Sequence, residues 1–243
     1  MTAGTSGRTA RLLRIAAGTA ALGLAVATAA CGTSTSASTG STSSPAALTL
    51  LPSADPFHSA VVATRALGTA RLAVRLTRQT PAGPVEQTGS GVSVLGQGRG
   101  DLRWTAPGTA YRELVNERAI YVTSDDRAWT QWSLDDPTAT SAYVDPLRGL
   151  GVLHDVTAEP DQTIGGVLTT PYTGWLPRAA PSVREDVTAW IDGSGHVIQV
   201  DREATDATGQ SLESSSTSMS DFSLLLDLSS PSQDVTLGSK PVP

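Results

Sequence analysis

Short segments that alternate between apolar and polar residues, separated by glycine and proline turns, fill most of this chain. The clearest is 71–77, where the sequence reads RLAVRLT. This period of two is that of a β-strand with one buried face. Because the segments follow one another through short turns, they predict an antiparallel sheet. We expect its strands at 71–77, 85–95, 101–105, 111–115, 119–123, 128–134, 163–175, 186–192, 196–205 and 210–226. Gly89 and Gly91 should interrupt the second of them.

Helical signals are few. Asp55 and Pro56 suit the N-cap and the first position of a helix that Gly68 ends. A second, short and irregular helical stretch is expected over 145–153. The order of helix, strands, short helix and strands predicts one α+β domain over 55–235, followed by a tail over 236–243.

The first thirty residues have the pattern of a secretory signal peptide. Three arginines precede an apolar run over 15–30, which at about sixteen residues is short for the roughly 20 that span a membrane. Cys31, the single cysteine of the chain, follows the small residues at the end of this run. In bacterial lipoproteins a cysteine in this place receives the acyl anchor, so we expect Cys31 to attach the protein to the outer side of the cytoplasmic membrane. An ordinary secretory peptide with an incidental cysteine is the alternative.

Residues 31–54 are expected to form a flexible tether, since ten of the sixteen residues 32–47 are serine or threonine and none is charged. Loss of the signal peptide would remove three arginines and leave fourteen basic residues against twenty-three acidic ones, a net charge of −9. Such a chain, with no basic cluster, is not expected to bind nucleic acid. One cysteine also excludes an internal disulfide.

The residues that could serve catalysis, metals or cofactors lack the spacing that such sites need. The three histidines, His58, His154 and His196, have no metal-ligand spacing. We expect His154 to cap the helical stretch 145–153 and His196 to be exposed beside a hairpin turn. Residues 96–100 (GQGRG) lack the strand and helix of a nucleotide site and are expected to be a loop.

The acidic pairs 125–126 and 135–136 are read as turn residues. Trp129 and Trp132, three apart, should lie on opposite faces of a strand. We therefore expect no enzyme, metal or cofactor; an extracytoplasmic hydrolase is poorly supported.

Several short motifs resemble the actinobacterial lipoproteins of the LppX/LprG type. They are 113–116 (ELVN) leading to 119–122 (AIYV), 145–150 (DPLRGL), 172–174 (YTG), 187–192 (VTAWID) before 195–197 (GHV), and 220–222 (SDF). The resemblance implies a LolA-like half-barrel, a curved antiparallel sheet with helices packed on its concave face.

Members of this family hold acyl chains of lipids or glycolipids in an apolar cavity, and some are thought to carry them across the envelope. The resemblance therefore implies lipid binding by this chain. Candidate cavity-lining residues, taken from the alternation and the 145–153 insertion, are Leu114, Ile120, Val122, Leu150, Val152, Leu153, Val167 and Trp190. At each position a plain core role is the simpler interpretation. The alternative function is a surface lipoprotein that senses the envelope or binds a protein partner without lipid cargo.

Overall fold

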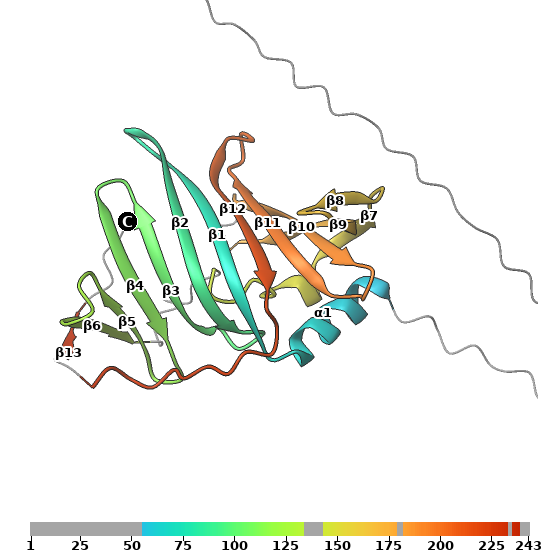
Figure 1. The fold of residues 1–243 in the computed structure, drawn as a ribbon. Coiled ribbons are helices and arrows are strands. Elements are labelled where there is room, and N and C mark those ends of the chain that lie inside the picture. The colour runs from blue at the N-terminus through green and yellow to red at the C-terminus, as the bar shows by residue number, and fades with distance from the viewer. Residues whose placement is uncertain (1–54, 134–142, 179–181, 233–234, 239–243) are drawn as a thin grey trace, which may run out of the picture. The chain divides into compact units, whose positions relative to one another are not determined.

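The computed structural model describes residues 55–133, 143–178, 182–232 and 235–238. The predicted signal peptide, Cys31, the tether, the Asp135–Asp136 pair and residues 239–243 lie outside these ranges. The described chain forms one curved, unclosed sheet that is antiparallel except at one edge (Figure 1). Along the sheet the strands follow the order β13, β6, β5, β4, β3, β2, β1, β12, β11, β10, β9, β7, and β8 also pairs with β9.

The strands are β1 (Thr69–Thr80), β2 (Gly83–Val94), β3 (Arg99–Ala106), β4 (Thr109–Val115), β5 (Ala119–Thr123), β6 (Trp129–Ser133), β7 (His154–Ala158), β8 (Gln162–Ile164), β9 (Val167–Pro177), β10 (Arg184–Asp192), β11 (Val197–Thr205), β12 (Ser211–Ser220) and β13 (Val235–Leu237). The predicted α+β fold with a curved antiparallel sheet is confirmed. Where the resemblance implied several helices, the described ranges hold one α-helix, α1 (Pro56–Ala66), and one 3-10 turn, η1 (Leu150–Val152).

Helix α1 begins as its sequence predicts. The Asp55 side chain accepts a hydrogen bond from the Phe57 amide at 3.0 Å, and Pro56 occupies the first turn. Gly68, with φ +81°, takes the left-handed conformation that ends the helix. Thr64 ties the helix to the sheet, because its hydroxyl accepts a 2.8 Å hydrogen bond from the amide of Val197 at the start of β11.

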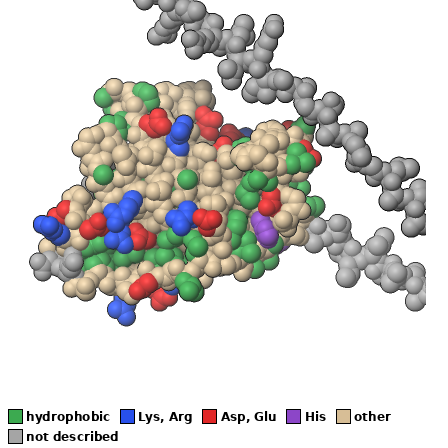
Figure 2. All heavy atoms as spheres, in the orientation of Figure 1, with side chains coloured by type: hydrophobic (Ala, Val, Ile, Leu, Met, Phe, Trp, Pro, Cys, Tyr) green, Lys and Arg blue, Asp and Glu red, His purple; other side chains and the backbone are tan. Residues whose placement is uncertain are grey.

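The two faces of the sheet differ in character. We call the face covered by α1 and residues 143–153 the inner face. Its core includes Leu72, Leu102, Ile120, Leu147 and Val187, each at most 2% exposed. We call the opposite, mainly polar face the outer face. On the face shown in Figure 2, basic and acidic side chains are interspersed rather than gathered by sign.

A second, smaller cluster lies on the outer face of β4 to β6. It contains Leu114, Ala119, Tyr121 and Trp129, with Leu228 packed against it. Trp132 belongs to the main core instead. The expectation that Trp129 and Trp132 lie on opposite faces is therefore confirmed.

Strand β2 is continuous, contrary to the predicted interruption at Gly89 and Gly91. These glycines lie on its inner face and make room for neighbours on β3. A Cβ at Gly89 would lie 2.9 Å from the Trp104 ring, and one at Gly91 would lie 1.9 Å from the Asp101 carbonyl oxygen. Close approach of β3, rather than a break in the strand, accounts for both glycines.

The region 154–177 also differs from prediction. The expected single strand 163–175 is a hairpin of β8 and β9, turned at Gly165 and Gly166. Strand β7 was not predicted. It is an exposed edge strand with a register shift and a positive φ of 52° at Asp155, so it lacks the apolar alternation that marks the other strands.

The predicted last strand, 210–226, ends early. Strand β12 stops at Ser220, because Asp221 and Ser223 adopt positive φ angles of 45° and 64°. The chain then crosses the ends of the strands, seen in red at the bottom of Figure 1, and adds β13 in parallel to β6. Along this path the Leu228 carbonyl accepts from the Asn116 side chain at 3.3 Å.

Candidate functional site

The inner face is the candidate functional site, and most of it is apolar. Strand residues from β1, β3, β5 and β10 pack against Val144, Leu147 and Leu150 of the covering segment. Each of these three side chains is at most 1% exposed. Burial of apolar surface stabilises by about 25 cal/mol per Å². This packed region, which we call the apolar floor, is filled by the protein's own side chains.

Beside the floor lies a group that we call the aromatic margin: the buried Trp104 and the half-buried Tyr111, Tyr143 and Val122. The ring centroids of Trp104 and Tyr111 are 6.3 Å apart, and those of Trp104 and Tyr143 are 5.7 Å apart, edge to face. Trp104 is buried and donates through Nε1 to Glu113 at 3.1 Å. Tyr111, Tyr143 and Val122 remain partly exposed, so part of their apolar surface is not covered within the described chain.

A set of ion pairs occupies the inner face next to the margin. We call it the ion network: Arg78 on β1, Glu213 on β12, Arg178, Glu185 on β10 and Arg202 on β11. Glu213 pairs with Arg78 at 3.1 Å and with Arg178 at 3.4 Å. Glu185 pairs with Arg178 at 3.1 Å and with Arg202 at 3.3 Å.

Arg202 is the most enclosed member, with a side chain 8% exposed. It also donates to the carbonyl oxygens of Pro146 at 3.0 Å and Arg148 at 2.6 Å. These bonds attach the segment that covers the floor to β11. Burial lowers the pKa of Arg202, and the charge of Glu185 opposes that shift.

Burial and nearby charges shift the pKa values of Glu213 and of the two margin tyrosines. Burial would raise the pKa of Glu213, but the hydrogen bond from Tyr143 and the charges of the two arginines outweigh it, so this pKa is lowered. Burial, followed by the charge of Glu213, raises the pKa of Tyr143. Burial and the charge of Glu113 raise the pKa of Tyr111 to about 12. Both tyrosines are therefore neutral hydrogen-bonding groups at ordinary pH.

The ion network was missed at the sequence level, although the sequence carries a signal for it. Glu185 shares the alternation of Val187, Ala189 and Ile191, and Arg202 stands between Val200 and Ala204. A charged residue at an inward position of a strand points to a buried ionic partner.

The structure brings four of the eight candidate lining residues together on the inner face and places the other four elsewhere. Ile120 and Leu150 lie in the apolar floor, with Val122 and Leu153 partly buried against it. Leu114 belongs to the outer-face cluster. Val152 and Val167 are 69% and 44% exposed. Trp190 lies on the outer face, because it alternates with the buried residues Ala189 and Ile191.

The histidines and the turn residues singled out in the sequence have the following places in the structure. His154 does not cap a helix, since it lies in β7 with its ring 4.5 Å from that of Trp175. His196 lies beside the β10–β11 turn but is half-buried rather than exposed. Of the loop expected over 96–100, residues 96–98 connect β2 and β3, whereas Arg99 and Gly100 belong to β3. Asp125 acts as a turn residue and accepts from the amides of Arg127 and Ala128.

No group of three or more potential metal ligands occurs among the described residues. Within the same ranges, no helix is long and apolar enough to cross a bilayer.

Comparison with solved structures agrees with this architecture. The chain is similar to two mycobacterial lipoproteins, LppX and LprF. The Mycobacterium tuberculosis lipoprotein LppX is 18% identical, with a TM-score of 0.48 over 72% of this chain and 96% of that one. LprF from Mycobacterium bovis is 15% identical, with a TM-score of 0.47 over 72% and 95%. A chain of the MucA/MucB complex of Pseudomonas aeruginosa is 13% identical, with a TM-score of 0.36 over 68% and 55%.

No protein-family model matches the chain, and no curated protein matches its sequence. At these identities the likeness concerns the fold, and function must be argued from the site.

Proposed function

We propose that this protein is a lipoprotein, anchored through Cys31 to the outer side of the cytoplasmic membrane, that binds an acyl chain of a lipid or glycolipid on its inner face. The observation that carries the proposal is the aromatic margin. It offers partly exposed apolar surface from Tyr111, Val122 and Tyr143 directly beside the apolar floor. An acyl chain laid there would remove this surface from water at about 25 cal/mol per Å².

The ion network suits the other end of such a ligand. Arg178 and Arg78 keep side chains 36% and 30% exposed, so they can offer hydrogen bonds to a polar headgroup while remaining paired with Glu213. The inner face is thus apolar at the floor and polar at the network, which matches an amphipathic molecule. Because the floor is filled by the protein's own side chains, the acyl chain would lie at the aromatic margin.

A second function is favoured by a different observation. The floor is closed by the protein's own side chains, and Val167 and Leu168, at the turn between β8 and β9, are 44% and 62% exposed. A filled inner face with an exposed apolar tip suits a lipoprotein that binds a protein partner without lipid cargo.

Native mass spectrometry of the domain from residue 55 onward, free of its acyl anchor, distinguishes the two. We expect an adduct with the mass of a lipid, which solvent extraction removes. Val122→Arg places a longer, charged side chain in the margin, opposite Glu113 on β4, and should reduce the adduct at least tenfold, because it occupies the space and removes the apolar surface that an acyl chain needs.

Val92→Arg is the matched control. Val92 is a half-buried valine on the outer face of β2, paired with Arg71 and Asp101, and its replacement should leave the adduct unchanged. Unfolding curves of both variants show whether either has lost its fold. A wild-type domain without any lipid adduct would contradict lipid binding and leave the interaction module as the better proposal.

A further inference from the structure

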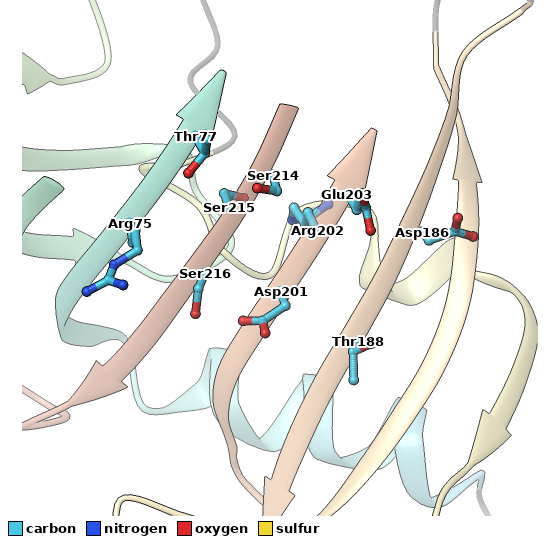
Figure 3. Close-up of a pocket in the computed structure, with 10 residues that line it drawn as sticks. All are labelled: Arg75, Thr77, Asp186, Thr188, Asp201, Arg202, Glu203, Ser214, Ser215 and Ser216. Carbon is cyan, nitrogen blue, oxygen red and sulfur yellow. The ribbon is translucent and has the colours of Figure 1, made fainter. Parts of the chain in front are cut away.

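The outer face carries a recess of about 320 Å³ over β1, β12, β11 and β10 (Figure 3). Its volume lies at the lower end of the roughly 300–1,000 Å³ typical of small-molecule sites. It is on the opposite face of the sheet from the aromatic margin, so it is separate from the proposed lipid site.

Strand pairing builds the recess from two rows of side chains. One row runs through Arg75, Ser216, Asp201 and Thr188, each paired with the next across neighbouring strands. The second row, one step along the strands, runs through Thr77, Ser214, Glu203 and Asp186. At about 4.8 Å between strands, four residues in a row span about 14 Å.

The lining is rich in groups that both donate and accept hydrogen bonds. Five of the lining residues carry hydroxyls, namely Thr77, Thr188, Ser214, Ser215 and Ser216, and three carry carboxylates that only accept. Asp201 is the central acceptor. Gln199 donates to its Oδ1 at 3.1 Å, and Ser216 also bonds to it, which leaves further lone pairs available. Burial raises the pKa of Asp201, which indicates that the carboxyl is poorly hydrated.

The charges around the recess disfavour an anion. Asp186, Asp201 and Glu203 line it. Of the two lining arginines, Arg75 is paired with Glu86 at 3.4 Å, and Arg202 directs its guanidinium to Glu185 on the inner face. The carboxylates do not form a cation site either. Asp186 is paired with Arg184 at 2.7 Å, and the three carboxylates are not grouped as metal ligands within the described residues. A neutral ligand with several hydroxyls fits this lining best.

An aromatic residue stands in the next row along the strands, beyond the residues that line the recess. Trp190 follows Thr188 on the same face of β10 and pairs with Gln199 on β11. Its ring is half-buried, and its Nε1 is buried with no hydrogen-bond partner. A ring at the edge of a hydroxyl-rich recess can contact the apolar C–H surface of a sugar.

We propose that this recess binds a neutral saccharide, with Asp201, Ser216 and Thr188 bonding the sugar hydroxyls and Trp190 contacting its apolar side. The site is separate from the acyl-chain proposal, because Asp201, Ser216 and Thr188 lie on the outer face; among the lining residues, Arg202 alone also belongs to the ion network. Rows of hydroxyls at strand spacing place several donors and acceptors within reach of one ring.

The test is saturation-transfer NMR on the full lipidated chain in lipid nanodiscs, with the methyl glycosides of glucose, galactose and mannose as probes. We expect at least one hexoside to bind, and the double variant Asp201→Asn, Thr188→Val to weaken that binding at least tenfold. Neither residue supports the inner face, so the variant should fold, and its unfolding curve confirms this. Ser90→Ala, an exposed outer-face position on β2 outside the recess, should leave binding unchanged.

Two results would overturn the proposal. One is that none of the three hexosides binds the wild-type chain better than it binds the double variant. The other is that spermidine, a polycation, binds at the recess while the hexosides do not. Lipid adducts are measured separately, so failure here leaves the acyl-chain proposal untouched.

Discussion

Replacing Arg202 with methionine is expected to lower the free energy of unfolding by about 3–5 kcal/mol, the usual cost of breaking a buried ion pair from one side. Arg202 and Glu185 have side chains only 8% and 9% exposed. The variant also leaves the carbonyls of Pro146 and Arg148 without their donor. Urea unfolding followed by tryptophan fluorescence measures the loss.

Two further variants show whether burial of the ion pair causes the stability loss expected for Arg202→Met. Arg71→Met removes an ion pair of 2.8 Å whose side chains are 56% and 59% exposed, and should cost no more than about 1 kcal/mol. The double variant Glu185→Leu, Arg202→Met removes both buried charges and should be more stable than Arg202→Met alone. If Arg202→Met costs no more than Arg71→Met, the ion network does not hold the covering segment to the sheet.

Gly91→Ala is the second change with a large expected effect, about 3 kcal/mol. Its Cβ would lie 1.9 Å from the Asp101 carbonyl oxygen and 2.9 Å from the Leu102 Cα, both backbone atoms of β3. Because no side chain can rotate away, β2 and β3 must separate. We expect a lower midpoint of thermal unfolding in circular dichroism.

Gly193→Ala is the matched control. Gly193 lies in the turn between β10 and β11, and a Cβ there would meet no atom within 4 Å. Its replacement should change stability by no more than about 0.5 kcal/mol. Equal stability of the two alanine variants would show that β3 does not approach β2 as closely as the fold requires.

The sequence was informative wherever one face of a strand is buried. Segment 71–77 alternates because Leu72, Val74 and Leu76 face the core while Arg71 and Arg75 face water. The same alternation correctly predicts that Trp129 and Trp132 lie on opposite faces of the sheet. It failed at β7, where both faces are largely exposed and no alternation is imposed. It also failed after Ser220, where leucines continue but the positive φ angles of Asp221 and Ser223 end the strand.

The candidate site was harder to predict, for a physical reason. Alternation assigns a residue to a face, but whether that face is filled depends on segments distant in sequence. Ile120 and Leu150 are enclosed because residues 143–153 fold back over the sheet. Leu114, one residue from the inward-facing Val115, lies on the other face. The ion network joins residues as far apart as Arg78 and Glu213, so only the fold brings it together.

Photo-crosslinking with a fatty acid that carries a diazirine at its methyl end tests the central claim most directly. If an acyl chain binds at the aromatic margin, mass spectrometry of the digested protein should find the label on peptides that contain Tyr111, Val122 or Tyr143, and unlabelled palmitate should compete it away. Label found only at exposed apolar residues such as Leu168 or Leu237, or no competable label at all, would contradict the proposal that the inner face binds lipid.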